Sequence, residues 1–299
     1  MRRGILAGLI AGLALGVLPF AAQAKAVGLP HIPAAVTTDP PTDKGHPARM
    51  EVLHIPSGGV EINGVAYLAS GAGVHPTVVL LHGLPGNEKN LDLAQAIRRA
   101  GWNCVTLNYR GSWGSPGSFS FEGNLADARA VLAFVRAPAN TAKFGIDIRR
   151  LVIAGHSMGG WVTGLTAAGD DGLAGAILIS AADMGGRGAV PAAKPAITKS
   201  MSTEMESLAG TSPEKMADEI IAMSPRLSFN AQVAKGLAAK PLLIVTSDDG
   251  LAPMGEKLAA AVKADGGRVA SVHIATDHSY SGKRIALEAA VIEWLQRLK

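Results

Sequence analysis

The chain has 299 residues, of which 48% are hydrophobic and 17% are charged, and its formal net charge is +4 at pH 7. This composition excludes a chain that is disordered throughout, because it holds enough apolar surface for a sizeable core. Basic and acidic residues are interspersed, so neither a nucleic-acid-binding protein nor a polybasic membrane-surface protein is favoured.

The N-terminal residues have the layout of a secretory signal peptide. Arg2 and Arg3 precede an apolar run over residues 5–20, and Ala22-Gln23-Ala24 follows as a small-residue cleavage site. The run is shorter than the roughly 20 residues that a membrane-spanning helix needs. We therefore predict a signal peptide over residues 1–24, cleavage after Ala24, a periplasmic or secreted protein, and no stable membrane association after cleavage.

Two further features precede or accompany the regular part of the chain. Residues 25–50 are rich in proline and lack apolar periodicity, which predicts an extended linker or N-terminal arm. Cys104 is the only cysteine, so an exported form has no internal disulfide and must be stabilised by core packing.

From residue 51 onward the pattern is regular and predicts one α/β domain over residues 51–299. Two short strands, 51–56 and 60–69, open it as an antiparallel pair. Apolar strand-like runs then alternate with helical stretches; the runs cover 76–82, 102–109, 149–155, 174–180, 240–247 and 267–275. Continuous apolar strands of this kind are typical of a mostly parallel central sheet with helices on both faces, which is a three-layer α/β fold.

The longest interval between strands, residues 181–240, predicts a helical cap over the carboxyl edge of the sheet, where open α/β sheets bind ligands. It contains more than half of the nine methionines: Met184, Met201, Met205, Met216 and Met223. Methionine serves both ordinary cores and adaptable apolar binding sites, so the sequence leaves both interpretations open.

Ser157 is the candidate nucleophile. It lies in "LVIAGHSMGGW", in a Gly-x-Ser-x-Gly turn between a strand and a helix, and this context favours an exposed serine at the sheet edge. A serine hydroxyl needs a base, an acid that orients the base, and donors for the developing oxyanion.

His278 is the best candidate for the base, because it follows the last strand in the polar loop "ATDHSYSG". The other histidines fit less well: His82 is placed to brace the "GLPG" loop, His156 neighbours the serine and could not face it, and His273 lies within a strand, where a packed structural role is expected.

The acid should also follow a strand. Asp248 and Asp249 end the strand-like run "LLIVTS", and Asp183 after "AILIS" is a third possibility. For the oxyanion, the backbone N–H groups of Leu84, in "HGLPG", and of Met158, directly after the serine, are the expected donors. The chain order Ser, Asp, His is the order that this type of fold uses.

The motifs "PTVVLLHGLPGNEKN", "LNYRGSWGSPGSF", "GHSMGG", "IVTSDDGLAP" and "DHSYSG" together resemble the α/β-hydrolase family. They are most similar to bacterial exported members related to dienelactone hydrolases and to the prolyl-oligopeptidase-type catalytic domain. The resemblance implies an α/β-hydrolase fold with a Ser157-His278-Asp249 triad, because the family acid lies four residues before the proline, here Pro253. It also implies that Arg110 and Asp127 tie the loop after "LNY" to the following helix.

The leading hypothesis is hydrolysis of a small-molecule carboxylic ester through an acyl-enzyme, with no cofactor and no metal, since no metal-ligand spacing is present. The alternative substrate is an amide, as in an aminopeptidase or acyl-peptide hydrolase, for which Glu204 and Glu206 could hold a free amino terminus. A catalytically silent binding protein on the same scaffold is the remaining alternative.

Overall fold

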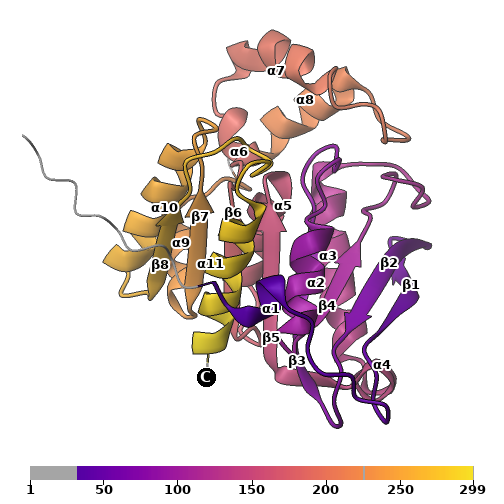
Figure 1. Cartoon of the computed structure of the whole chain (residues 1–299). Coiled ribbons are helices and arrows are strands. Elements are labelled where there is room, and N and C mark those ends of the chain that lie inside the picture. Colours follow the sequence, from indigo (N-terminus) through magenta and orange to yellow (C-terminus); the bar gives the residue numbers. More distant parts are fainter. Residues whose placement is uncertain (1–31, 225, 299) are drawn as a thin grey trace, which may run out of the picture. The chain divides into compact units, whose positions relative to one another are not determined.

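The fold is built on a central eight-stranded sheet, seen in a computed structural model that describes residues 32–224 and 226–298 (Figure 1). The predicted signal peptide lies outside the described residues. The strands are β1 Arg49–Ser57, β2 Val60–Leu68, β3 His75–Leu81, β4 Asn103–Leu107, β5 Ile146–His156, β6 Gly175–Ile179, β7 Leu242–Thr246 and β8 Val269–His273. Their order is β1-β2-β4-β3-β5-β6-β7-β8. The first two pairings in this order are antiparallel and the rest are parallel. The antiparallel β1–β2 pair and the mostly parallel sheet confirm the sequence prediction, which did not include the antiparallel pairing of β2 with β4.

Helices cover both faces of the sheet. The helices are α1 Ala34–Thr37, α2 Leu91–Arg99, α3 Phe121–Arg136, α4 Pro138–Phe144, α5 Met158–Ala168, α6 Met184–Arg187, α7 Lys194–Met201, α8 Pro213–Met223, α9 Ala231–Ala238, α10 Ala252–Ala264 and α11 Arg284–Arg297, with a 3-10 turn at Pro191–Ala193. One core joins the sheet to α3, α5, α9 and α10, and a second core joins the opposite face to α1, α2 and α11.

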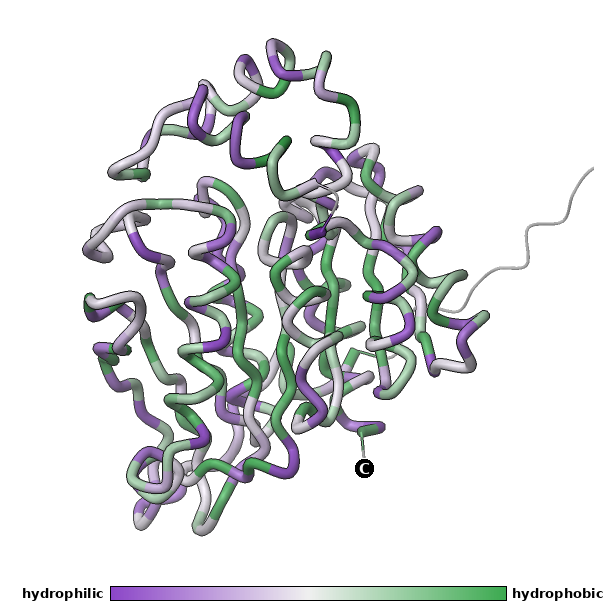
Figure 2. Tube along the Cα trace, turned by 180° about the vertical axis from the view of Figure 1, so that it is seen from behind, coloured by the Kyte–Doolittle hydropathy of each residue, from purple (hydrophilic) through white to green (hydrophobic). Residues whose placement is uncertain are grey.

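The two cores explain the continuous apolar runs. Along β3, Val79 and Leu81 belong to one core, whereas Val78 and Leu80 belong to the other. Because successive side chains of a strand point to opposite faces, a strand that is covered on both sides must be apolar at every position. Figure 2 shows this as a hydrophobic interior along the strands, beneath a cap of mixed hydropathy.

The predicted cap interval, residues 181–240, divides into two parts. Helices α7 and α8 lie beyond one end of the strands (Figure 1), and their buried side chains continue the core that contains α5. Helix α9 instead packs against α5 and α10 as part of the helical layer on the sheet. The cap is therefore shorter than the sequence predicts, because α9 is the crossover helix that returns the chain to β7.

The predicted N-terminal arm is partly folded onto the domain. Its residues 34–37 form α1, in which Val36 is buried in the core with α2 and α11. Arg99 Nε donates a hydrogen bond to the Ala35 carbonyl at 2.6 Å. The described part of this segment is thus attached at residues 34–37 and is not an extended linker there.

Two smaller features complete the description of the fold. The loop after β4 is tied to α3 by Arg110 and Asp127, whose Nε and Oδ1 atoms are 2.7 Å apart, and this confirms the pairing that the family resemblance implies. Within residues 32–224 and 226–298, no helix combines the length and the apolar character that a membrane span requires.

Candidate active site

Ser157 occupies a sharp turn between β5 and α5. Its backbone has φ 57° and ψ −122°, a strained conformation for a residue other than glycine, and its N–H donates to the Ile179 carbonyl at 2.9 Å. The turn requires backbone contact on both sides: a Cβ atom at Gly155 would lie 2.1 Å from the Gly159 carbonyl oxygen, and one at Gly159 would lie 2.5 Å from the His82 carbonyl oxygen. The glycines of the motif are therefore dictated by packing.

Asp249 and His278 are brought together from loops that follow β7 and β8. His278 Nδ1 lies 2.7 Å from Asp249 Oδ2. Since an ionised carboxylate only accepts hydrogen bonds, this contact places the proton on Nδ1 and leaves Nε2 as the acceptor of the neutral ring. Asp249 Oδ1 accepts a second hydrogen bond, from the Leu251 N–H at 2.8 Å, which fixes the carboxylate plane.

The two other candidate acids do not reach His278. The side chain of Asp248 is 62% exposed, against 3% for Asp249, and it lies 3.1 Å from Nε2 of His273. The prediction that His273 is packed was wrong, because β8 is the edge strand and its histidine is 49% exposed. Asp183 caps α6 by accepting from the Gly186 N–H, and it also accepts from the Phe229 N–H.

Burial alone would raise the pKa of Asp249, but the hydrogen bonds from His278 and from the Leu251 N–H outweigh it, and the pKa is held below its ordinary value of 3.8. A hydroxyl cluster lies behind this carboxylate: Ser180 Oγ is 3.0 Å from Ser247 Oγ and 2.9 Å from the Tyr280 hydroxyl, and all three residues are buried. Both serines also contribute to the lowered pKa of Asp249. The acid therefore remains ionised at neutral pH.

Ser157 and His278 both line two adjoining pockets of about 260 and 250 Å³. Asp249 borders the first pocket, which faces the cap, and Leu84 borders both. No hydrogen bond joins the Ser157 hydroxyl to His278 among the contacts of the described residues. The structure thus brings the predicted nucleophile and base to one site, and their catalytic roles stay predictions.

The loop that carries Leu84 passes directly beside Ser157. A Cβ atom at Gly83 would lie 2.9 Å from the Ser157 Cβ. His82 Nδ1 bonds the Gly83 carbonyl at 2.7 Å, in keeping with its expected bracing position, and burial lowers the pKa of His82 to about 4. Met158 opens α5, and the first N–H groups of a helix have no intrahelical acceptor. Both predicted oxyanion donors therefore lie beside the serine.

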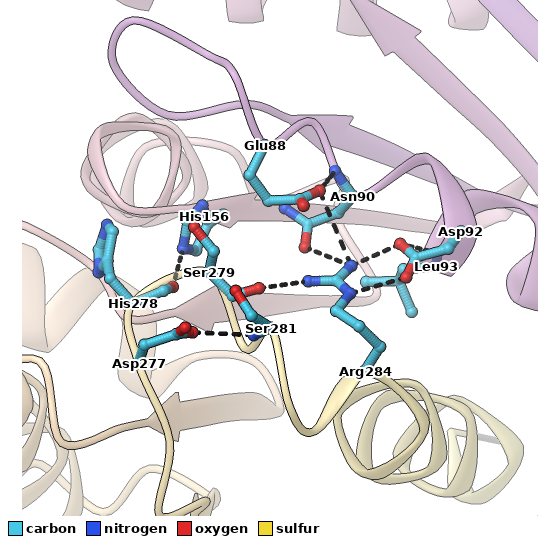
Figure 3. A network of polar contacts seen from close by, with 10 residues as sticks. All are labelled: Glu88, Asn90, Asp92, Leu93, His156, Asp277, His278, Ser279, Ser281 and Arg284. Carbon is cyan, nitrogen blue, oxygen red and sulfur yellow. Dashed lines mark hydrogen bonds and ion pairs between the residues drawn. The ribbon is translucent and has the colours of Figure 1, made fainter.

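Two positioning contacts on the His278 loop were missed by the sequence analysis (Figure 3). His156 Nε2 lies 2.8 Å from the His278 carbonyl oxygen, and burial together with the neighbouring His278 lowers the pKa of His156 to about 4. His156 is next to Ser157 in the sequence, but no local pattern indicates that it supports the backbone of the base.

Arg284 connects the His278 loop to the loop after the predicted oxyanion segment (Figure 3). Its Nη1 donates to the Ser279 carbonyl at 2.9 Å, and its Nη2 donates to Asn90 Oδ1 at 3.0 Å. Its Nε donates to Asp92 Oδ2 at 2.7 Å. An arginine at the start of a helical pattern carries no signal in the sequence that would have identified this role.

The cap contributes the remaining walls of the first pocket. Met184 and Met201 line it and are also buried in the core, whereas Met216 and Met223 are buried in the core without lining either pocket. Both interpretations of the cap methionines therefore apply to Met184 and Met201, and the core interpretation alone applies to Met216 and Met223. The polar lining from the cap consists of Arg187, Ser200 and Glu204. Glu206 is exposed and does not line either pocket.

No group of three or more His, Cys, Asp or Glu side chains is arranged to hold a metal ion within residues 32–224 and 226–298.

Comparisons with known proteins agree with this architecture. The model of the alpha/beta hydrolase family matches residues 78–290. No curated protein sequence gives a significant match to the chain.

Many solved structures, including the following three, are similar to it. An esterase from Pyrobaculum calidifontis is 20% identical with a TM-score of 0.59, over 84% of this chain and 86% of that one. Est1E from Butyrivibrio proteoclasticus, solved with ferulic acid, is 18% identical with a TM-score of 0.63, over 82% and 98%. An acylaminoacyl peptidase from Pyrococcus horikoshii is 18% identical with a TM-score of 0.61, over 84% and 41%. At these identities the likeness establishes the fold.

Proposed function

Because the chain belongs to the α/β hydrolase family, we propose that it hydrolyses carboxylic esters of small molecules through an acyl-enzyme on Ser157. The observation that carries this proposal is the 2.7 Å contact between His278 Nδ1 and Asp249 Oδ2 at the pocket that Ser157 also lines. An acid, a base and a hydroxyl that borders the same pocket are the groups that serine-dependent acyl transfer requires.

The first half of the proposed reaction forms the acyl-enzyme. Ser157 Oγ attacks the acyl carbon while His278 Nε2 takes the hydroxyl proton, and Asp249 stabilises the imidazolium that results. The N–H groups of Leu84 and Met158 donate to the oxyanion of the tetrahedral intermediate. Its collapse breaks the bond to the alcohol oxygen, which leaves with the proton from His278.

The second half releases the acid. Water attacks the acyl carbon as His278 Nε2 takes its proton, and the second tetrahedral intermediate collapses to free the carboxylic acid and return the proton to Ser157 Oγ. No other proton carrier is needed, because His278 alternates between acceptor and donor in both halves.

The test is a series of p-nitrophenyl esters of increasing acyl length, measured beside aminoacyl p-nitroanilides on the purified protein and on Ser157→Ala. We expect ester turnover in the unmodified chain and a loss of about 10⁵- to 10⁶-fold in the variant, as for removal of a catalytic serine. A fluorophosphonate label should attach to the unmodified chain and not to the variant. Ester turnover that Ser157→Ala retains would overturn the proposal.

A peptidase or amidase is the second candidate, and one observation favours it. Glu204 borders both pockets beside Ser157 and is half-buried, so its carboxylate can receive a free amino group. Its predicted companion Glu206 is exposed and does not line the site. Turnover of anilides faster than of esters, lost in Glu204→Gln, would assign the protein to this second class.

We propose in addition that the protein is exported after removal of residues 1–24, on the strength of the three-part sequence pattern. The check is N-terminal sequencing of the protein from the periplasmic and extracellular fractions of an expressing bacterium. Lys25 is the expected first residue, and a protein that retains Met1 in both fractions would contradict cleavage.

A further inference from the structure

Among the described residues that line the two pockets at Ser157, Arg187 is the one lysine or arginine. It ends α6 and faces the cap-side pocket together with Met184, Ser200 and Met201. Its Nη2 donates to Ser200 Oγ at 3.1 Å, which links α6 to α7. The guanidinium is therefore held in place by the cap itself, in the same pocket as the proposed nucleophile.

The charge of Arg187 is poorly compensated. A guanidinium has five N–H donors, and Ser200 is its single hydrogen-bond partner among the described residues. Burial lowers the pKa of Arg187, and Glu204 opposes this from outside ion-pair distance. Binding of an anion stabilises a half-buried cation more when the hydrogen-bond partner of that cation is a neutral hydroxyl than when it is already a carboxylate.

The two pockets differ in charge on either side of Ser157. The cap-side pocket contains Arg187 beside two carboxylates, Glu204 and Asp249, whereas the charged residues that line the other pocket, among those that the structure describes, are Glu88 and Glu204 with no lysine or arginine. Ser157 and His278 belong to both. An ester with its acyl carbon at Ser157 thus has one half in the pocket with the cation and the other half in a pocket with carboxylates only.

We propose that Arg187 is an anion-binding residue, so that the preferred substrates are esters carrying a carboxylate on the half that enters the cap-side pocket. This inference rests on the proposed ester hydrolysis. A carboxylate binds the planar guanidinium through two parallel hydrogen bonds, a geometry that a neutral chain end cannot reproduce. Met184, Met201 and Leu251 line the same pocket as Ser157 and Arg187, and their apolar side chains suit a short hydrocarbon spacer.

The experiment compares charged and neutral esters on the full chain. The acyl-side pair is mono-p-nitrophenyl adipate against p-nitrophenyl hexanoate, and the alcohol-side pair is 4-carboxyphenyl hexanoate against phenyl hexanoate. We expect a higher kcat/KM for the charged member of one pair. In Arg187→Gln that preference should fall about 10- to 100-fold, mainly through KM, while the neutral esters change less than about twofold.

Three further variants distinguish recognition of the substrate carboxylate by Arg187 from a structural role of this residue and from an effect of the overall charge of the cap. Lys199→Gln removes an exposed cation on the same cap helix as Ser200 and should leave the preference unchanged. Ser200→Ala removes the bond that links α6 to α7 but keeps the cation, and it should retain the preference. Glu204→Gln removes a nearby negative charge and should increase turnover of the charged ester.

The outcomes distinguish this inference from the proposed function. Equal turnover of charged and neutral esters in the unmodified chain, or an equal loss of both in Arg187→Gln, would overturn the anion subsite while leaving ester hydrolysis intact. Absence of turnover of all four esters, charged and neutral, would instead overturn the proposed function itself.

Discussion

Asp248 and Asp249 are adjacent in the chain and alike in chemistry, yet they occupy different environments. Asp249 is 3% exposed and bonded to His278, whereas Asp248 is 62% exposed and contacts His273 on the edge strand. The turn after β7 thus directs one carboxylate inward and the other to solvent. The local sequence does not determine which of the two carboxylates contacts His278. The geometry of this turn does.

The first prediction concerns this pair. Asp249→Asn should lower kcat for ester hydrolysis by about 10³- to 10⁴-fold, because an amide at this position disturbs the tautomer of His278 that the carboxylate selects. Asp248→Asn removes the same charge one residue away and should change kcat less than about threefold, since its partner is exposed. Steady-state kinetics with one p-nitrophenyl ester measures both, and the reverse ranking would show that Asp248 is the acid.

At the scale of elements, the site is formed where loops meet beyond the carboxyl ends of the parallel strands. Ser157 follows β5, Asp249 follows β7, and His278 follows β8, so each residue is supplied by a different strand. The His278 loop leads into α11, whose first residue, Arg284, bonds both this loop and the loop that precedes α2. The position of the base therefore depends on a contact between elements distant in sequence.

The second prediction tests this contact. Arg284→Met removes the bonds to Ser279 and Asn90 and the cationic partner of Asp92. We therefore expect kcat to fall about tenfold or more with little change in KM, as for a residue that positions the base. Arg284→Lys retains the charge without the fork of donors and should recover only part of the loss. A change in thermal stability with kcat preserved would show that the contact is structural alone.

At the scale of the whole molecule, two buried histidines flank the site. His82 is 2% exposed and His156 is 3% exposed, and burial is the main cause that lowers the pKa of each to about 4. Both are therefore neutral in the folded protein at neutral pH, whereas in the unfolded chain they take up protons as the pH falls below about 6.5. The free energy of unfolding thus decreases as the pH falls from about 6.5 to 4, and above about pH 6.5 these two histidines cause no such decrease.

The third prediction follows from this loss. Each histidine should contribute on the order of 3 kcal/mol to the decrease in the free energy of unfolding between pH 6.5 and 4. His82→Asn and His156→Gln each keep a nitrogen donor near the position of the bonded ring nitrogen but cannot be protonated. Denaturant unfolding at several pH values should show a flatter acid decline in the double variant. An unchanged slope would mean that other groups cause the decline.

The sequence by itself determined the three-layer fold, the mostly parallel sheet and the family, because strand and helix periodicities and the order of motifs are local properties of the chain. It also identified Ser157, Asp249 and His278 as candidates, since each follows a strand whose carboxyl end lies at the same sheet edge.

Only the tertiary structure decided which of those residues are in contact and what surrounds them. The pairing of His278 with Asp249, the bond from His156 to the His278 carbonyl and the bond from Arg284 to Asn90 all join residues far apart in the chain. The position of Arg187 in the same pocket as Ser157 is likewise set by the fold. The assignment of α9 to the sheet layer and of α1 to the second core is likewise tertiary, because a helical or proline-rich pattern does not specify its packing partner. Distances between such segments are set by the folded core, and local periodicity carries no information about them.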